Sequence, residues 1–428
     1  MPRRVVAVLI CLAVVSRAAP AQTLRDKISQ LFSFGSCGQP LCLDGSVSAA
    51  NGHGDHFIGS VEGTNKAIIT FLTEAVGVSL GHIPLSAASS GATFTFVDGL
   101  PVKTSSSAGP IFGERAPTLG RNRLLFGANV TSLNFTTLRG LPIRGLNFNF
   151  THQDVAAPGL GDPLFENDVI SVKTSLDLNL LATSAFFTYG LLDNVDISVA
   201  VPFVYTTLRG NSVGQVNPFG SSALHFFAGT SSDPILRAAA DVEGTASGIG
   251  DVAGRIKVNL SQAPIFGFSL LVDARFPTGD KTNLIGSGAI VVRGIGVMSG
   301  QYGSFSPHLN AGYLYHGSQM QSNAVLATFG FDQLLSGWAT LAADVITERQ
   351  IGDNKLILPG PVEYDVPFRR FVSPTDIPNR RDNLVNASLG MKFTTTNGLR
   401  LVFNGIVPIE RAGLQPDVIW TSGLEYTF

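Results

Sequence analysis

Apolar and polar residues alternate with a period of two along much of this chain. Near its end, Trp420, Leu424 and Phe428 fall on one face of an extended segment. Thr421 and Glu425 fall on the opposite face. A strand that crosses a membrane in a β-barrel needs this pattern, with apolar residues toward lipid and polar residues toward the lumen. The pattern therefore predicts a membrane-spanning strand that ends at the terminal phenylalanine.

The same alternation recurs in a series of segments, many of them longer than the five or six residues that are usual for strands of water-soluble proteins. Their length favours a transmembrane antiparallel β-barrel, an all-β fold, over a soluble sandwich. The predicted strands are 122–136, 141–153, 168–191, 194–208, 248–261, 264–277, 287–302, 305–318, 322–335, 338–351, 382–396, 399–410 and 417–428.

The connections between these strands are alternately short and long. Bacterial outer-membrane barrels have short periplasmic turns and long external loops, so this alternation predicts the topology. If Phe428 lies on the periplasmic side, every short turn falls on that side as well. The short turns are 191–194, 302–304, 336–337 and 396–398, and the long connections are 153–168, 209–247, 278–287 and 352–381.

The number of strands follows from parity. The segments above number thirteen, and a single-chain bacterial barrel needs an even number. Ser86–Val97, which contains Ala92-Thr93-Phe94-Thr95-Phe96, is the candidate for the missing strand, so that the barrel domain would span 86–428. This gives about fourteen strands. A hairpin through Asp98-Gly99 would change the parity, so twelve and sixteen stay open.

Residues 22–85 lack the strand pattern. Leu24–Phe32 and a segment after Gly63-Thr64 have apolar residues at helical spacing. The apolar faces of these helices need to pack against other apolar groups. The lumen of a barrel of this width is either filled or conducts solutes. We therefore expect 22–85 to form a partly helical plug inside the barrel. A mobile periplasmic extension is the alternative.

The first residues and the overall composition agree with export to the outer membrane. Residues 1–21 combine Arg3-Arg4, an apolar run too short to span a bilayer and small residues at Ala19 and Ala21, as a secretory signal peptide does. Only 14% of the residues are charged, with a net charge of −2. This argues against a nucleic-acid partner. The mature sequence has no apolar stretch of about eighteen residues, which excludes a helical membrane protein.

Motifs for catalysis or cofactor binding are weak. Cys37 and Cys42 are expected to form a small loop disulfide, because an exported chain meets an oxidising compartment. His53, Asp55 and His56 are too few and too glycine-flanked to predict a metal site. Gly210-Asn211-Ser212-Val213-Gly214 matches the pattern of a hydrolase elbow, but it follows a barrel strand and precedes no helix. We predict no enzyme activity and no cofactor.

Charged residues on the predicted lumen faces are the remaining candidates for function. Basic and acidic residues balance, so mutual pairing that braces the wall and holds the plug is favoured over a selectivity lining, which usually has an excess of one sign. His308 and His316 are predicted to face the lumen as well. The charged candidates are Lys173, Asp177, Asp196, Arg255, Lys257, Asp273, Arg275, Asp344, Lys392, Arg400 and Glu425.

Several short motifs resemble a known family. Gly248-Ile249-Gly250-Asp251, Phe276-Pro277-Thr278-Gly279-Asp280 and Gly286-Ser287-Gly288 resemble the outer-membrane family linked to the meta-pathway of phenol degradation. So do the motif at 109–120 and the one that begins at Tyr189. That family is related to the FadL/TodX-type transporters of fatty acids and aromatic hydrocarbons. The likeness covers most of 109–318.

The resemblance implies a fourteen-stranded barrel with an N-terminal hatch that passes hydrophobic small molecules. It also implies that Leu424, Tyr426 and Phe428 form the signal read by the barrel-assembly machinery, and that lipid and lipopolysaccharide surround the barrel. We therefore predict passive uptake of aromatic compounds or fatty acids. A structural barrel that binds ligands through external loops 209–247 and 352–381 is the alternative.

Overall fold

The computed structural model describes residues 22–34, 41, 55–81, 94–97, 100–103, 107–152, 167–220, 225–263, 265–318, 320–355, 357–365 and 367–428. The predicted signal peptide, Cys37, Cys42 and His53 lie outside these residues, as do the side chains of Asp55 and His56. None of the described helices is long and apolar enough to cross a membrane.

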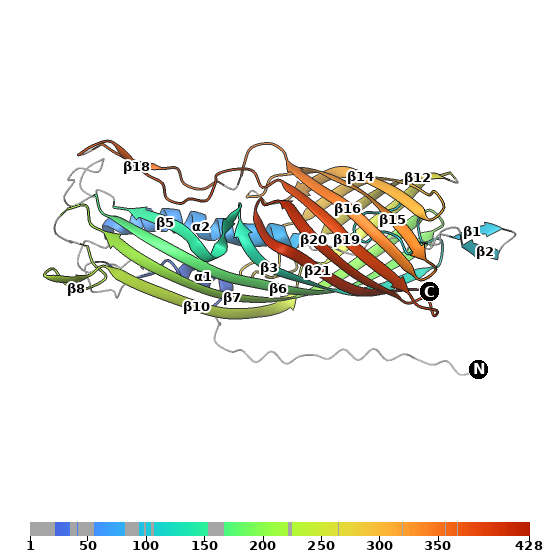
Figure 1. The fold of residues 1–428 in the computed structure, drawn as a ribbon, viewed down its shortest axis with the longest axis horizontal. Coiled ribbons are helices and arrows are strands. Elements are labelled where there is room, and N and C mark those ends of the chain that lie inside the picture. Colours follow the sequence, from blue (N-terminus) through green and yellow to red (C-terminus); the bar gives the residue numbers. More distant parts are fainter. Residues whose placement is uncertain are drawn as a thin grey trace.

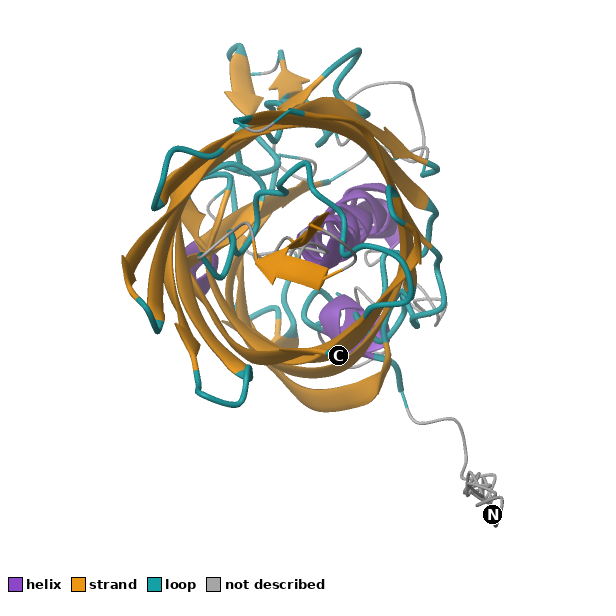
Figure 2. Cartoon of the chain, turned by 90° about the vertical axis from the view of Figure 1, so that its right-hand side faces the viewer, coloured by secondary structure: helices purple, strands orange, loops and turns teal. Residues whose placement is uncertain are grey.

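The chain folds into a closed antiparallel barrel, as the alternation predicts (Figures 1 and 2). The ring closes because β6 pairs with β7 on one edge and with β3 on the other. The ring strands are β3 (Leu124–Leu138), β6 (Val169–Leu192), β7 (Val195–Asn217), β11 (Ala253–Gln262), β12 (Phe266–Arg275), β13 (Val291–Gly300), β14 (Phe305–His316), β15 (Ala324–Ser336), β16 (Ala339–Gln350), β19 (Leu384–Thr394), β20 (Arg400–Glu410) and β21 (Leu414–Thr427).

The ring contains twelve strands, one of the two alternatives left open, and the count of fourteen is wrong. Two predicted ring members cause the difference. The segment at 94–97, β1 (Phe94–Val97), pairs with β2 (Leu100–Lys103) in a separate hairpin. The segment at 141–153 forms β5 (Leu146–Thr151), which pairs with β6 beyond the end of β3 and adds no strand to the ring.

Short elements complete the described structure. β4 (Leu141–Pro142) forms a small hairpin with β3, and a 3-10 helix, η1 (Ile143–Gly145), leads from it into β5. β10 (Arg237–Ile249) pairs with β7 outside the ring. The remaining hairpins are β8 (Ala228–Thr230) with β9 (Asp233–Ile235), and β17 (Val362–Tyr364) with β18 (Arg370–Val372).

The four predicted short turns lie at the end of the barrel that holds the C-terminus, whereas the short connection 411–413 between β20 and β21 lies at the opposite end. The amide N–H of Phe428 donates to the carbonyl of Leu124, at 2.8 Å. Leu124 is in turn paired with Tyr189, just before the turn that joins β6 to β7. The common side of the predicted short turns is therefore confirmed, and in bacterial outer-membrane barrels the side with short turns is the periplasmic one.

The two longest strands, β6 and β7, extend far beyond the ring. β6 has 24 residues, which is roughly 80 Å of strand, whereas about 9–11 residues cross a membrane. Together with β5 and β10 they form a tall curved sheet at the end opposite the C-terminus (Figure 1). We call this sheet the extension.

The faces of β6 and β7 change polarity where the extension begins. Leu181 and Tyr205 are paired, face outward and are more than 40% exposed. The next outward pair is Asn179 with Thr207, and polar residues prevail on the outer face from there. The inner face changes to apolar residues at the same level, which include Leu176, Leu178, Leu180, Leu208 and Val216.

This inversion explains why the prediction of a long loop at 209–247 is wrong. Residues 209–217 continue β7, and 237–249 form β10. Above the bilayer the outer face of a strand meets water instead of lipid and is therefore polar. The sequence of such a strand is then similar in composition to that of a loop. Gly210, Ser212 and Gly214 lie on the inner face here, where small residues leave room for the side chains of the helical segment.

Two helices cover the inner face of the extension. α1 (Leu24–Gln30) begins with a capping box between Thr23 and Asp26 and packs against β10. α2 (Asp55–Gly81) contacts α1, β5 and β21. Phe32, just after α1, packs edge-on against Phe148 at 5.3 Å between ring centroids. In the view along the barrel axis the helices lie within the outline of the ring (Figure 2).

An apolar belt surrounds the ring. Along β7, β12, β14 and β20 most outward side chains are apolar, and many of them are large and about 36–61% exposed. A water-soluble protein of this size does not expose such a continuous apolar surface. The closed barrel and its belt place the protein in the bacterial outer membrane. Belt residues include Val199, Val201, Phe203, Leu270, Val272, Leu309, Tyr313, Phe403, Val407 and Ile409.

Candidate functional site

Residues 107–119, which we call the strap, cross the lumen of the ring near its periplasmic end. The amide of Ala108 donates to Thr340 on β16, at 3.0 Å. Further along, the amide of Leu119 donates to Asp196 on β7, at 2.9 Å. The strap thus links distant strands of the ring. Its backbone groups find partners on the wall because the strap has no regular secondary structure to satisfy them.

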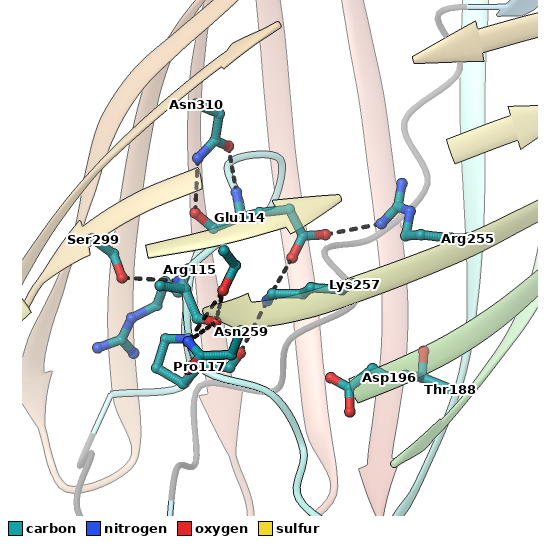
Figure 3. A network of polar contacts seen from close by, with 12 residues as sticks. Glu114, Arg115, Pro117, Thr188, Asp196, Arg255, Lys257, Asn259, Ser299 and Asn310 are labelled. Carbon is teal, nitrogen blue, oxygen red and sulfur yellow. Dashed lines mark hydrogen bonds and ion pairs between the residues drawn. The ribbon is translucent and has the colours of Figure 1, made fainter. Parts of the chain in front are cut away.

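Glu114 is the central charged residue of the strap (Figure 3). Its carboxylate lies 2.8 Å from the guanidinium of Arg255 and 3.3 Å from the ammonium of Lys257. Its amide donates to the side chain of Asn310 at 2.7 Å, and Asn310 donates back to its carbonyl at 3.0 Å. Lys257 also donates to the carbonyl of Pro117, at 2.9 Å. These buried bonds hold the strap to β11 and β14, and those from Arg255 and Lys257 are charge-assisted.

Close packing fixes the strap as well. A Cβ atom on Gly113 would lie 2.0 Å from Nε2 of His308 and 3.0 Å from a carboxylate oxygen of Asp344. That histidine nitrogen and that oxygen are themselves 2.7 Å apart, and both side chains are buried. Only glycine fits at this crossing without displacing the pair.

Nine of the eleven predicted charges lie inside the ring. Arg255 and Lys257 pair with Glu114 of the strap, and Asp196 accepts from the amide of Leu119. Asp273 pairs with Arg255 and Arg275, and Asp344 pairs with His308. Lys392 pairs with Glu425 at 3.2 Å, both of them fully buried, and Arg400 is the cross-strand partner of Glu425. His316 is also buried. The arrangement is one of paired charges.

Lys173 and Asp177 do not face the lumen, so their predicted placement is wrong. Both lie on the outer face of β6 in the extension, where Lys173 is exposed and Asp177 pairs with exposed Arg144 at 3.1 Å. The sequence pattern assigns polar residues of a barrel strand to the lumen. That rule reverses above the bilayer, where the outer face meets water.

A chamber of about 200 Å³ lies above the strap. Phe112 and Glu114 of the strap line its periplasmic side, and Arg255, Asp273, Arg275 and Arg293 line one wall. Ala75 and Ser79 of α2 reach its upper part. Its walls are mainly apolar and include Leu133, Phe135, Leu271, Ile295, Leu326, Ile346, Leu384, Ile406, Leu414 and Ile419. The chamber lies at the height of the belt, since Leu271 points inward between the lipid-facing Leu270 and Val272.

The wall beside the chamber is irregular. The pairing of β3 with β6 stops at Phe135, and pairing along that edge of β6 resumes only at Leu146 of β5. On the other edge of β3, the register with β21 shifts twice around Pro416. Proline has no amide proton to donate to the ladder. The wall therefore has fewer hydrogen bonds here than elsewhere in the ring.

A buried ion pair supports this part of the wall. The guanidinium of Arg139, in the turn after β3, donates to both carboxylate oxygens of Asp382 at 2.8 and 2.9 Å. It also stacks on the ring of Phe71 in α2, at 4.6 Å. Asp382 accepts a further bond from the amide of Gly413, at 2.9 Å. The pair thus connects the helical segment to both strands at the irregular wall.

A second buried cluster closes the far end of the extension. Nδ1 of His225 lies 2.7 Å from Asp168, and Phe57 of α2 packs edge-on against His225 and His152, each at 5.0 Å. Nearby, burial raises the pKa of Tyr364 to about 12. Residues of 352–381 that form β17 and β18 thus take part in packing at this end.

The other predicted motifs form no site among the residues that the structure describes. Ser212 lies inside β7 and shares a hydrogen bond of 2.8 Å with Thr174, so its motif is not a strand-to-helix elbow. No cluster of three or more potential metal ligands occurs in the described part of the chain.

Sequence reasoning missed the strap, Glu114, Arg293 and the Arg139–Asp382 pair. The strap has neither helical nor strand periodicity, and Glu114 and Asn310 are 196 positions apart. The one available signal was the alternation of β13, which places Arg293 on the same face as Ile295 and Val297.

Comparison with known proteins gives one family match and several solved structures. A family model described as a putative MetA-pathway of phenol degradation matches residues 160–369. The COG4313 outer membrane channel from Pseudomonas putida F1 is 10% identical, with a TM-score of 0.41, over 73% of this chain and 98% of that chain. No curated protein matches the sequence.

Two further solved structures are similar. A deltaS2 mutant of the TodX monoaromatic hydrocarbon channel is 11% identical, over 73% of this chain and 91% of that chain, with a TM-score of 0.32. The Ralstonia pickettii toluene transporter TbuX is 9% identical, over 72% and 90%, with a TM-score of 0.34. The chain is thus similar over 160–369 to the phenol-degradation family that its sequence motifs resemble.

Proposed function

We propose that the protein is a passive channel that takes up small hydrophobic molecules, aromatic compounds or fatty acids, across the outer membrane. The observation that carries this proposal is the apolar chamber inside the ring at the height of the belt. A porin lumen for sugars or ions is polar and open at this height. Here the walls of the chamber are mainly apolar, and the strap closes the lumen below it.

The proposed exit is the irregular wall rather than the periplasmic end of the lumen. Leu133, Phe135 and Pro416 line the chamber where the pairing between β3 and β21 is irregular. A hydrophobic solute that leaves here enters lipid and keeps its apolar surface out of water. The axial route would require the strap to give up the buried bonds of Glu114. On this account the segment 22–85 acts as a plug on the extracellular side.

Uptake into vesicles with a lipopolysaccharide outer leaflet tests the proposal, because that leaflet slows apolar solutes that cross phospholipid freely. We expect the protein to speed the entry of 4-methylbenzyl alcohol or decanoate and not that of xylose. Leu271→Trp fills the chamber and should lower apolar uptake at least fivefold. Leu270→Trp, one residue away on the lipid face, is the matched control and should leave uptake unchanged.

Equal rates with and without protein would contradict the proposal. A barrel that passes neither solute, yet is correctly inserted, would favour the alternative role in structure or surface binding. Of the two external segments considered for that role, much of 209–247 lies in strands, so 352–381 would be the candidate.

A further inference from the structure

A polar hollow of about 540 Å³ lies on the outer face of the extension. It is formed by β5, β6, β7 and β10 (Figure 1) and by Asp376, whose segment runs along the free edge of β5. Ten of its thirteen lining residues are polar or charged. Its volume is within the 300–1,000 Å³ of small-ligand sites, and its lining suits a polar ligand rather than the apolar solute of the chamber.

The side chains of the hollow stand in rows across the sheet. The outermost row consists of the successive cross-strand partners Asn149, Ser171, Gln215 and Arg237. In the next row toward the bilayer, Lys173 stands between Asn147 and Val213. Lys173 and Arg237 are therefore diagonal neighbours, and the usual spacing of strands puts their Cα atoms about 12 Å apart. Two side chains of this length can reach one ligand that lies between them.

Charges in the rows nearer the bilayer are paired. Arg144 lies 3.1 Å from Asp177, and Arg209 lies 3.0 Å from Glu243. Since each of these cations has its own carboxylate on the same face, neither is available to an anion from solution.

The two cations of the outer rows are different. Within the part of the chain that the structure describes, neither Lys173 nor Arg237 forms an ion pair or a side-chain hydrogen bond. The carboxylates that flank the hollow have other partners, because Asp376 accepts from Asn147 at 2.9 Å and Asp241 accepts from Asn211 at 2.7 Å. The surface between the two cations is lined by Ser171, Val213 and Gln215, and no carboxylate lines it. Two cations thus face this part of the hollow without a partner.

The hollow is continuous with the lipid-facing belt. Along β6 it extends from Ser175 to Ser171, six to ten residues beyond Leu181, the last lipid-facing residue of that strand. This distance is about 20–33 Å of strand. The outer leaflet of the bacterial outer membrane consists of lipopolysaccharide, whose acyl chains meet the belt and whose sugars project beyond it. The hollow is therefore at the level of those sugars rather than at the bilayer surface.

We propose that this hollow binds a phosphorylated sugar of the lipopolysaccharide core, with Lys173 and Arg237 on the phosphate. A guanidinium fork bonds two phosphate oxygens at once, and an ammonium adds a point charge. The amides of Asn149 and Gln215 and the hydroxyl of Ser171 can donate and accept, as sugar hydroxyls do. Basic residues next to a membrane bind anionic lipid head groups in the same way. This inference does not depend on the proposed channel function.

Calorimetric titration of the full chain in detergent micelles tests the inference with three probes. They are the phosphorylated core oligosaccharide that mild acid releases from a rough-type lipopolysaccharide, the same oligosaccharide after hydrogen fluoride has removed its phosphates, and inorganic phosphate. We expect the phosphorylated oligosaccharide to bind at least tenfold more tightly than either of the others. Equal affinity for the two oligosaccharides, or no binding of either, would overturn the inference. Inorganic phosphate that binds as tightly as the phosphorylated oligosaccharide would overturn it too, since the sugar would then contribute nothing.

Variants locate the binding in the hollow. Lys173→Gln and Arg237→Gln should each weaken binding of the phosphorylated oligosaccharide at least fivefold and change that of the dephosphorylated one less than twofold. Arg209→Gln removes a cation from the same outer face but outside the hollow, and should change neither affinity. An equal loss in Arg209→Gln, or no loss in either hollow variant, would overturn the inference.

A steric pair gives a test that does not remove charge. Val213→Trp fills the hollow and should weaken binding of the phosphorylated oligosaccharide at least tenfold. Val201→Trp makes the same change on the same face of β7 within the belt and should leave the affinity unchanged. Unchanged affinity in folded Val213→Trp would show that the oligosaccharide binds elsewhere and would overturn the inference.

Discussion

The ring and the extension share strands β6 and β7. The inner and outer faces of these two strands have opposite polarity in the two regions. In the ring, β7 presents Val199, Val201 and Phe203 to lipid and Asp196 to the lumen. In the extension it presents Arg209 and Asn211 outward, while Leu208 is buried under the helical segment. The ring is therefore organised as a membrane protein, and the extension is organised as a soluble sheet with an apolar core.

The chamber lies where these two regions meet. The strap of the ring closes it on the periplasmic side, apolar and charged side chains of the ring line its walls, and α2 contributes Ala75 and Ser79. An apolar lumen at the height of lipid is unusual for a water-filled pore and suits a hydrophobic solute. The change of polarity along the strands thus produces the feature on which the proposed function rests.

The largest expected effect is at the contact between the two regions. Arg139→Ala leaves Asp382 buried without its bidentate partner, and Arg139 is itself fully buried. Removing one member of a buried pair typically costs about 3–5 kcal/mol. We expect a loss of that size in the free energy of unfolding by urea in liposomes. Arg209→Ala, which breaks the exposed pair with Glu243, should cost no more than about 1 kcal/mol. Similar losses in both would contradict this assignment.

A charge on the outer face of β7 should separate the regions directly. Val201→Arg places a charge in lipid, which costs about 2–4 kcal/mol near the middle of the bilayer. Asn211→Arg places the same charge on the same face, ten positions further along, where water surrounds it. We expect that change to stay within about 0.5 kcal/mol. Equal destabilisation, measured by urea unfolding, would show that lipid reaches the extension.

A smaller effect is expected at the strap. Gly113→Ala forces a methyl group against His308 and Asp344, and overpacking of this kind typically costs about 1–3 kcal/mol. The strap should also open partly, which a rise in single-channel ion conductance would reveal. Gly145→Ala is the control, because a Cβ there meets nothing within 4 Å. An unchanged conductance with full stability in Gly113→Ala would argue against tight packing of the strap.

The sequence predicts the ring well because each of its strands repeats one rule. Apolar residues such as Val201 and Leu270 face lipid, and the alternation reveals them without any knowledge of their neighbours. The position of Phe428 among the short turns then predicts the topology. The phenol-degradation motifs add the resemblance that the family match supports.

The extension and the strap could not be predicted by that rule. Above the bilayer the outer face becomes polar, so 209–217 resembles a loop and Lys173 is assigned to the wrong face. The strand count failed because 141–153 was counted in the ring and the argument from parity then added 94–97, whereas β5 pairs only with β6 and β1 pairs locally with β2. The strap depends on partners such as Ser299 and Thr340, which lie far away along the chain. No local pattern marks such contacts.

The most direct test of the account is apolar uptake with the strap locked to the wall. Ala116→Cys and Ser299→Cys would join two positions whose amide and hydroxyl lie 2.9 Å apart, with each single variant as control. If the solute leaves through the irregular wall, vesicle uptake of 4-methylbenzyl alcohol by the oxidised double variant should stay within twofold of the reduced form. A tenfold loss on oxidation, reversed by reductant and absent in both single variants, would show that the solute passes the strap and would contradict the account.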